Sequence, residues 1–340
     1  MKALYVGIDR PGTTSRNRRL TLERLLPGWE HSHVDTAVPF DHCSRLSRSI
    51  AFRLKTGPAL RAINASLLLH VEQEKTHYDI VWVDKAVFFY PSTIRRLRQL
   101  AGRLIHYTPD TAFYENRSRH FASSIELYDF VVTTKSFEID QYSSLIPKNR
   151  LIVTTQGYDQ MVHRPLHTPA EKRSGVAFAG LAERDRFEKV ELLLDNGIPV
   201  RVAGPGWERF SAKHSKNPQY QFAKSFLSGD EYVDFISSAR FGLGLLSKRF
   251  PELHTTRTFE IPACGTALIT ERNEETESYF APDEAVFHSS PEELIRRLKE
   301  LEENPNELVK ISKAGRARVE KEGRSYDEIF RGLLKALELI

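Results

Sequence analysis

The chain has few of the features that mark secreted, membrane-spanning, redox or metal-dependent proteins. Its only cysteines, Cys43 and Cys264, lie far apart and lack the spacing of a metal site, which favours a reduced, cytoplasmic compartment. No segment approaches the roughly 18 consecutive apolar residues of a membrane span, and Asp9 cuts the first apolar run too short for a signal peptide. The sequence contains neither the Gly-x-Gly-x-x-Gly fingerprint of a nicotinamide site nor an Asp-x-Asp pair for a divalent cation. We therefore expect no bound cofactor and no metal.

Length, composition and charge limit further which class of protein this can be. A chain of 340 residues exceeds what one ordinary core supports, so two domains are the default. Hydrophobic residues at 40% and charged residues at 28% are typical of a globular protein. A net charge of +4 does not indicate nucleic acid as a partner.

Basic residues are nevertheless concentrated between Arg45 and Arg61, where they alternate with apolar residues. A basic amphipathic stretch can dock on the anionic inner face of a membrane or on a charged acceptor. The competing interpretation is a helix face that is simply exposed to solvent. Peripheral membrane contact is therefore one of two expectations for this segment.

Short apolar runs alternate with amphipathic stretches along both halves of the chain. In the first half we predict strands at 2–8, 32–38, 79–84, 103–107, 129–134 and 150–154, and helices at 15–26, 58–74, 92–101 and 118–127. The pattern restarts with strands at 175–179, 200–203, 221–223, 242–246 and 267–270, and helices at 186–196, 229–238 and 259–264. The alternation predicts an α/β protein with two doubly wound parallel sheets.

The polar segment 158–174 contains Pro165 and Pro169 and is the natural linker between the halves. We predict a first domain at 1–165, a second at 175–324 and a final helix at 325–340. Two such domains that face each other create a cleft at the carboxyl ends of their strands, where ligands bind in open α/β sheets.

Residues 252–270 carry the most informative polar pattern in the chain. Two carboxylates, Glu252 and Glu260, flank the run Thr255-Thr256-Arg257-Thr258, and a short apolar helix, a glycine and a buried strand follow. A Thr-rich loop that opens a helix offers N–H groups, hydroxyls and a guanidinium to a phosphate. A carboxylate one turn into the helix can hold ribose hydroxyls. The pattern therefore favours a sugar-nucleotide site over the alternative, an amphipathic helix with glutamates on its wet side.

The same segment resembles the C-terminal signature of GT-B glycosyltransferases, in particular the group named after the spore-maturation protein CgeB. The Arg-x-Phe-Glu-x-x-x-Cys-Gly motif of that group is matched from Arg257 to Gly265, and the likeness continues through 270–280, 290–294 and 313–316. The spacing of the two glutamates is also similar to the Glu-x7-Glu element of retaining enzymes that include bacterial lipopolysaccharide glycosyltransferases. Pro262 departs from the pattern, and because proline removes a donor early in the helix, the helix is expected to start late or bend there.

The resemblance implies a GT-B fold, with two Rossmann-like domains facing a central cleft and a C-terminal helix that crosses back to the first domain. It implies that the first domain binds an acceptor and the second a UDP- or GDP-linked sugar. Donor contacts are expected from Thr255 and Thr256. The resemblance assigns the remaining roles as follows: the diphosphate to Arg257, Thr258 and Arg186, the ribose to Glu260, and a hydroxyl of the donor sugar to Glu252. A metal-independent transfer that retains anomeric configuration would follow.

Upstream of this motif, two strand ends in the second half carry further candidates. Gly180 follows the first of these strands, and Arg186 comes where the next helix opens, the place where a helix N-terminus and a guanidinium can meet an anion. Gly204 and Trp207 follow the next strand, and the tryptophan could wall a nucleotide. A surface arginine and a plain turn with a packing tryptophan are the alternatives.

In the first half, His106 and Asp110 lie at the end of a predicted strand. Such a pair could orient or deprotonate an acceptor hydroxyl, and an inverting enzyme would need one of them as its base. The alternative is a capping Asp beside a hydrogen-bonded His.

Three functions remain open at the level of sequence. The favoured one is a glycosyltransferase of cell-surface polysaccharide synthesis, whose acceptor would be a glycan, a lipid-linked glycan, a polysaccharide or a protein. The others are a sugar-nucleotide epimerase of the same architecture and a non-catalytic protein that binds sugar nucleotides. An epimerase would need a cluster of acid and base residues around the sugar, and the spacing shows none.

Overall fold

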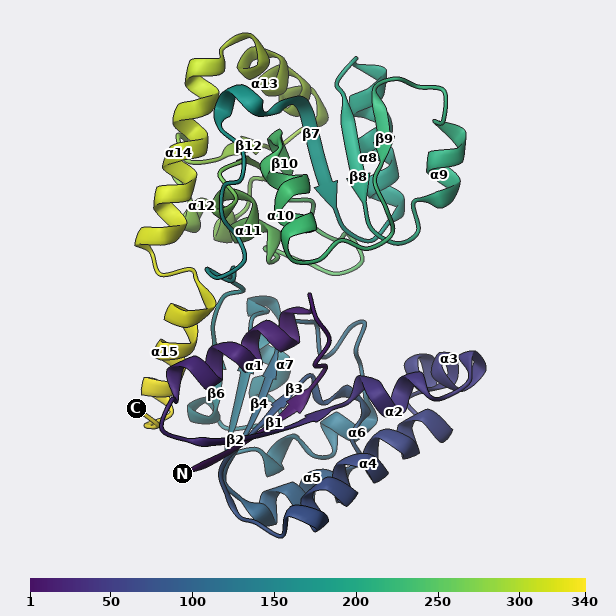
Figure 1. Cartoon of the computed structure of the whole chain (residues 1–340), viewed down its shortest axis with the longest axis vertical. Coiled ribbons are helices and arrows are strands. Elements are labelled where there is room, and N and C mark those ends of the chain that lie inside the picture. Colours follow the sequence, from purple (N-terminus) through teal and green to yellow (C-terminus); the bar gives the residue numbers. More distant parts are fainter. The chain divides into compact units, whose positions relative to one another are not determined.

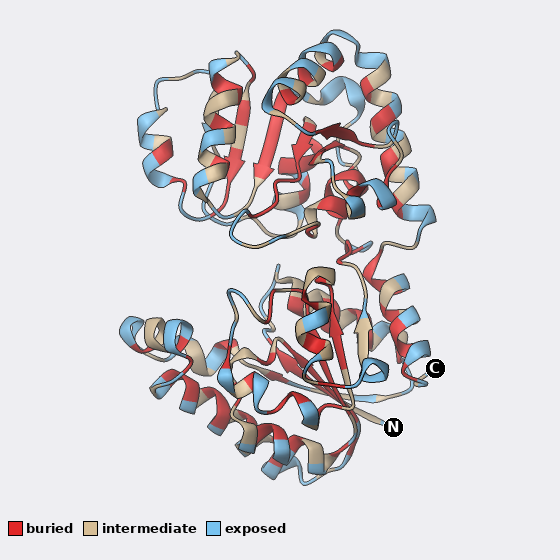
Figure 2. Cartoon of the chain, turned by 180° about the vertical axis from the view of Figure 1, so that it is seen from behind, coloured by how far each residue is buried: buried red, intermediate tan, exposed pale blue.

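The computed structural model describes residues 1–340 and divides them into two compact units, Met1–Thr155 and Gln156–Ile340 (Figure 1). Each unit is built around one six-stranded sheet, and every pair of neighbouring strands is parallel. Figure 2 shows buried strands in both units and helices whose outer faces are exposed. No helix is both long enough and apolar enough to span a bilayer.

The sheet of the first unit has the strand order β2-β1-β3-β4-β5-β6. The strands are β1 (Lys2–Gly7), β2 (Glu30–Asp35), β3 (Tyr78–Asp84), β4 (Ala101–Thr108), β5 (Phe130–Thr133) and β6 (Leu151–Val153). The helices are α1 (Thr14–Leu25), α2 (Ala37–Asp41), α3 (Arg45–Leu54), α4 (Pro58–Glu74), α5 (Pro91–Leu100), α6 (Arg119–Ala122) and α7 (Ile139–Ser143). The order of strands reverses between β1 and β3, which makes their carboxyl ends the switch point of this sheet.

The two faces of this sheet are covered differently. On one face, apolar side chains of α4 and α5, such as Leu67 and Ile94, pack with Val6 and Val81 of the strands. On the other face, the guanidinium of Arg18 on α1 lies 5.1 Å from the centre of the Tyr107 ring. Arg18 also forms a buried, bidentate ion pair with Asp84 at the end of β3, with Nη2 2.8 Å from Oδ2.

The sheet of the second unit has the order β12-β11-β10-β7-β8-β9, the doubly wound arrangement of dinucleotide-binding folds. The strands are β7 (Arg173–Ala179), β8 (Val200–Ala203), β9 (Tyr220–Phe222), β10 (Ala239–Leu243), β11 (Ala267–Glu271) and β12 (Val286–His288). The helices are α8 (Arg184–Asp195), α9 (Glu208–Lys213), α10 (Asp230–Ser237), α11 (Arg257–Ala263), α12 (Glu274–Tyr279), α13 (Pro291–Glu303), α14 (Pro305–Lys321) and α15 (Tyr326–Ala336).

Two apolar clusters lie on the opposite faces of this second sheet. On one face, Val190 of α8 and Leu298 of α13 pack with strand residues such as Phe178. On the other, Ile236 of α10 and Phe259 of α11 pack with a second set of strand side chains. Helices on both faces leave the loops at the carboxyl ends of the strands to form a site.

The structure corrects several predicted boundaries. The strand predicted at 32–38 ends at Asp35, whose carboxylate accepts the N–H of Ala37 (2.8 Å) and so turns the chain into α2. The helix predicted at 118–127 is interrupted where the Ser124 hydroxyl donates to His120 O (2.8 Å). The strand predicted at 242–246 is β10, which starts earlier, at Ala239.

Candidate functional site

The loops that follow β7 and β10 form the candidate ligand site of the second unit. These strands are neighbours, and the strand order reverses between them. Open parallel sheets bind ligands at such a switch point, beyond the carboxyl ends of the strands. Arg257 lies there: its Nη1 donates to Ala179 O at the end of β7 (3.4 Å), and its Nη2 donates to Leu245 O just after β10 (3.2 Å).

Arg186 of α8 lies beside Arg257. Both guanidinium groups lie over the ring of Phe178, with their central carbons 5.6 and 5.5 Å from its centroid. Arg186 Nη1 donates to Leu181 O (2.8 Å) and lies 3.3 Å from the Glu183 carboxylate. Burial and then the positive charge of Arg257 lower the pKa of Arg186 from its usual value. Two cations are therefore held close together in a largely buried place, where an anion would relieve their repulsion.

Several polar atoms at this point lack a hydrogen-bond partner. They include three buried side-chain atoms: Nε of Arg186, Nε of Arg257 and the hydroxyl oxygen of Thr255. The backbone N–H groups of Thr256 and Arg257 also donate to no other group of the protein. Buried polar groups are nearly always paired in folded proteins, and a ligand rich in oxygen acceptors would pair this cluster of donors.

The helix α11 begins at Arg257 rather than at the expected Phe259, and Pro262 lies inside it without ending it. Its seven residues give it only a short dipole, so the charge at the site comes mainly from the guanidinium groups. The side chain of Thr258 is fully buried, and its hydroxyl oxygen accepts the N–H of Thr255 (3.1 Å). Thr258 therefore shapes the turn that presents Thr255 and Arg257.

The two glutamates of the motif occupy different surroundings. Glu252 is half-buried, and its Oε2 accepts the N–H of Ser247 (2.9 Å) in the loop after β10. Glu260 is buried, and its Oε2 accepts the hydroxyl of Tyr232 on α10 (2.7 Å). The other oxygen, Oε1, lies 3.7 Å from Nε2 of His163. Glu260 is thus held in a fixed position by two polar partners, and burial together with Glu260 raises the pKa of Tyr232 well above its usual value.

Gly180 and Gly204 bring the loops after β7 and β8 into direct contact. Gly180 N donates to Ala203 O (2.8 Å). Gly204 has a φ of +128°, and a Cβ added there would lie 2.1 Å from Gly180 O. Both positions thus hold backbone close to backbone, which only glycine permits at Gly204.

Trp207 lies in the core rather than at a surface. Its side chain has no exposed area, and its indole Nε1 donates to Gly180 O (2.9 Å). The ring meets Phe178 and Phe187 edge to face, with centroids 6.0 and 5.0 Å away. Trp207 is therefore a packing residue that supports the loops, which was the alternative interpretation, and its ring does not form the wall of a ligand site.

The first unit has its own cavity at the switch point of its sheet, with a volume of about 460 Å³. Its wall includes the strand-end residues Ile8, Asp84 and Lys85, the aromatic rings of Phe40, Phe52 and Phe88, and the charged side chains of Arg10, Asp41, Arg48 and Asp110. Helices α2 and α3 close one side of it. A cavity that combines aromatic rings with cations and carboxylates can take a ligand with both apolar and hydrogen-bonding parts.

Asp110 lines this cavity, but His106 does not. Asp110 Oδ2 lies 2.8 Å from Lys85 Nζ. Although burial alone would raise the pKa of Asp110, the ion pair and hydrogen bond with Lys85 outweigh burial and lower it. The His106 ring is buried on β4, with centroids 4.7 Å from Phe121 and 5.4 Å from Tyr128. Burial lowers the pKa of His106 to about 4, so the ring is neutral and shielded from solvent.

Sequence reasoning missed the residues that hold the candidate site in place. Tyr232 and His163 hold Glu260 in position. Glu183 pairs with Arg186, and its Oε2 also accepts the hydroxyl of Ser247 (2.9 Å). No spacing rule links these positions, because they come from separate elements. No group of three or more His, Cys, Asp or Glu side chains has an arrangement that could hold a metal ion.

Comparison with solved structures identifies the fold of the chain. Solved structures with the same fold include a sucrose-phosphate synthase from Thermosynechococcus elongatus (TM-score 0.67, 13% identity, 99% of both chains). They also include Anabaena HepE in complex with UDP-glucose (TM-score 0.64, 10% identity, 100% of both chains). A third is an α,α-trehalose 6-phosphate synthase from Burkholderia multivorans (TM-score 0.63, 10% identity, 99% of this chain and 98% of that one). The chain has the GT-B fold of these proteins.

The sequence comparison covers less of the chain than the structural comparison does. A family model described as glycosyl transferase-like matches residues 184–335, which include Arg186, Glu252, Arg257 and Glu260. No curated protein matches the chain. The match thus covers most of the second unit, the one that carries the two arginines.

Proposed function

We propose that the protein is a glycosyltransferase that moves a sugar from a nucleotide diphosphate sugar to an acceptor hydroxyl. The observation that carries the proposal is the pair of largely buried arginines, Arg186 and Arg257, with unpaired Nε atoms at the switch point of the second sheet. The family model that covers both arginines supports it, as does the same fold in HepE, whose structure contains UDP-glucose.

The donor's diphosphate is proposed to lie against Arg186, Arg257 and the hydroxyl of Thr255. When the bond to the sugar breaks, negative charge builds up on the leaving diphosphate, and fixed guanidinium groups in a water-poor site stabilise that charge. This role is one that a divalent cation performs elsewhere, so we propose a metal-independent reaction. Its rate should be unchanged after EDTA treatment; a rate restored only by Mg²⁺ would contradict this part of the proposal.

Glu260 is proposed to hold the ribose hydroxyls, and Glu252 a hydroxyl of the donor sugar. Tyr232 supports the first role because its hydroxyl fixes Glu260 Oε2 (2.7 Å) while the carboxylate still has acceptor capacity. Glu260→Gln should therefore weaken binding of UDP without a comparable loss for pyrophosphate, which has no ribose. Equal losses for both ligands would assign Glu260 to the phosphate or to the fold.

We propose that the transfer retains anomeric configuration. The Glu-x7-Glu spacing supports retention, and so do the acid–base properties of the first unit. An inverting enzyme needs a base with a pKa near the working pH, whereas Lys85 holds the pKa of Asp110 low and burial brings that of His106 to about 4. NMR of the first-formed product should show the donor's anomeric configuration; the opposite configuration would restore Asp110 as a candidate base.

The acceptor is proposed to bind in the cavity of the first unit. Its aromatic rings can stack on a sugar or an apolar chain. Arg10 and Arg48 share one carboxylate, that of Asp41, which leaves a positive charge for an anionic group. An acceptor that is a charged or lipid-linked glycan fits both features. Arg48→Ala should then raise the acceptor KM while leaving the donor KM unchanged, and a change in the donor KM alone would contradict the assignment.

Helix α3 supports a further part of this proposal, contact with an anionic membrane at the cytoplasmic face. Its exposed apolar side chains are Leu46 (71%), Phe52 (58%) and Leu54 (69%), and the exposed Arg45 and Arg53 lie on the same helix. Apolar side chains beside cations suit an interface with anionic lipids. Vesicles containing phosphatidylglycerol should bind the wild type and bind a Phe52→Ser, Leu54→Ser variant less. Equal binding by both proteins would rule out α3 as the contact.

The decisive experiment compares two arginines of the same helix. Arg186 is buried at the switch point, whereas the side chain of Arg184 is 90% exposed and pairs with Glu188. Calorimetric titration with UDP should show a Kd raised about 10- to 100-fold in Arg186→Gln, because a charge-assisted hydrogen bond is worth about 1.5–3 kcal/mol. Arg184→Gln should bind UDP like the wild type.

Equal affinity in Arg186→Gln and the wild type would overturn the donor-site assignment. Incubation with a panel of UDP- and GDP-sugars, with and without acceptors, then separates the classes of function. Turnover that depends on an acceptor supports transfer. Epimerised sugar nucleotide without an acceptor would instead indicate an isomerase, and tight binding without turnover would indicate a non-catalytic protein.

A further inference from the structure

The second unit has a cavity at the edge of its sheet opposite the arginine pair. Its volume is about 380 Å³. Lys172 directly precedes β7, Arg240 lies near the start of β10, and Gly265 precedes β11, so the cavity opens at the amino ends of these parallel strands. Arg186 and Arg257 lie beyond the carboxyl ends. The proposed donor site therefore does not account for this cavity.

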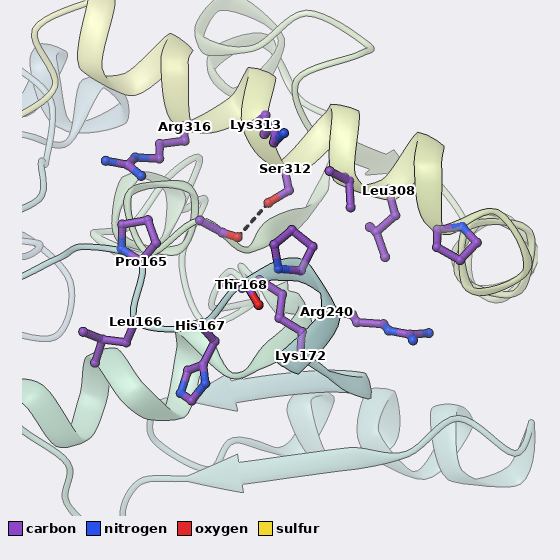
Figure 3. Close-up of a pocket in the computed structure, with 14 residues that line it drawn as sticks. Pro165, Leu166, His167, Thr168, Lys172, Arg240, Leu308, Ser312, Lys313 and Arg316 are labelled. Carbon is purple, nitrogen blue, oxygen red and sulfur yellow. Dashed lines mark hydrogen bonds between the residues drawn. The ribbon is translucent and has the colours of Figure 1, made fainter.

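The walls of this cavity are apolar on two sides. One wall is the segment 165–169, with Pro165, Leu166 and Pro169, and the other is the start of α14, with Pro305, Leu308 and Val309 (Figure 3). The α14 wall is joined to the loop before β11 by the hydroxyl of Ser312, which donates to the carbonyl oxygen of Gly265 (2.7 Å). This dashed contact in Figure 3 fixes the distance between α14 and the loop before β11.

The charged residues that line the cavity all have the same sign. They are Lys172, Arg240, Lys313 and Arg316, and no aspartate or glutamate lines it. Arg240 pairs with Glu302 and Arg316 with Glu320, both outside the lining. An apolar space with only basic side chains around it is complementary to an anion with an apolar body.

Lys172 has no carboxylate partner, unlike Arg240 and Arg316, and it is half-buried, unlike the exposed Lys313. Its Nζ donates to Ser237 O and to the Thr266 hydroxyl oxygen (3.1 Å), which are both neutral. Burial lowers the pKa of Lys172 to about 8, because the ammonium group is partly removed from water. An ammonium in such surroundings gains more from an anionic partner than a surface lysine does.

We propose that this cavity is a binding site for a small organic anion, whose acid group pairs with Lys172 and whose apolar body lies between the 165–169 segment and α14. The acid can be a carboxylate, a phosphate or a sulfonate, because Lys172 acts as a point charge and does not select a geometry. The site is independent of the proposed sugar-nucleotide site, and each can fail without the other.

Two dyes that differ by one sulfonate group test this proposal on the full chain. The anionic dye 8-anilinonaphthalene-1-sulfonate and its neutral analogue N-phenyl-1-naphthylamine have the same aromatic body. Fluorescence titration should show tight binding of the sulfonate and weaker binding of the neutral dye. In Lys172→Met the Kd of the sulfonate should rise about tenfold or more, in line with the loss of a charged hydrogen-bonding partner, while the neutral dye keeps its affinity.

The controls separate this site from others that bind dyes. Lys216→Met removes an exposed lysine from the loop before β9 and should leave both affinities within about twofold, since a distant exposed charge is screened. Val309→Trp fills the cavity from a half-buried position and should weaken both dyes even if Lys172→Met fails to fold. Saturating UDP should displace neither.

Three results would overturn the proposal. One is equal sulfonate binding by Lys172→Met and the wild type. Another is unchanged binding of both dyes by Val309→Trp. The third is displacement of the sulfonate by UDP, which would place the dye in the sugar-nucleotide site instead.

Discussion

The buried ion pair between Arg18 and Asp84 gives a quantitative test of what holds the first unit together. Arg18 Nη2 lies 2.8 Å from Asp84 Oδ2, and the two side chains are 0% and 1% exposed. Removal of either partner leaves a buried charge without compensation, which costs about 3–5 kcal/mol. We therefore expect Asp84→Asn and Arg18→Met each to lower the free energy of unfolding of this unit by that amount. The double variant should lose less than the sum of both.

Differential scanning calorimetry provides the assay, because it records the transition of each unit separately. For a unit of this size, each kcal/mol corresponds to roughly 2–4 °C in Tm. Each single variant should therefore melt roughly 6–20 °C below the wild type. The control is Glu30→Gln, which breaks the surface pair of Glu30 with Lys2 and should cost about 1 kcal/mol or less. Single variants that melt like this control, or a double variant that loses the full sum, would refute the reasoning.

Two further substitutions test the assignments of single residues. His106→Gln should leave transfer intact. Because burial lowers the pKa of folded His106 to about 4, the stability that His106 contributes is present above pH 6.5 and is lost as pH falls towards 4. The free energy of unfolding of the variant, measured in urea, should therefore depend less on acid pH. A large loss of activity would return His106 to the catalytic set. Gly204→Ala should lower the free energy of unfolding by about 1–3 kcal/mol or more, because φ is +128° and the new Cβ would lie 2.1 Å from Gly180 O. An alanine variant as stable as the wild type would show that the loops can separate.

The regular parts of the fold could be predicted because local chemistry and periodicity agree there. Helix α4 spans Pro58–Glu74 as predicted, with proline in its first turn and Leu60, Ile63 and Leu67 on a buried face. Strand β8 at Val200–Ala203 also has the predicted bounds. The short strand β12 (Val286–His288) was missed, because three residues are too few to show a period.

The candidate site was predictable only where its residues lie close together in sequence. The Thr255–Glu260 segment was found as a unit, whereas the partners of Glu260, namely Tyr232 and His163, lie on α10 and in the segment before β7. Trp207 follows a Gly-x-Gly turn that suggests a ligand wall, yet its ring lies in the core. Which side of a loop a residue faces depends on packing between distant elements, and that information is not in local spacing.

Arginine side chains are buried in both units of this protein, but for different reasons. Arg18 meets one carboxylate through three hydrogen bonds and completes the core of its unit. Arg186 and Arg257 instead lie beside each other and leave both Nε atoms unpaired, with Glu183 as a carboxylate partner of Arg186, and burial and then the charge of Arg257 lower the pKa of Arg186. A core gains nothing from two adjacent cations, since each costs desolvation and their repulsion adds to it. A dianion would reverse that balance: at a concentration of 100 Kd it would stabilise the folded unit by about 2.7 kcal/mol. If the arginine pair binds a diphosphate, as we propose, UDP should raise the Tm of the second unit and leave that of the first unchanged.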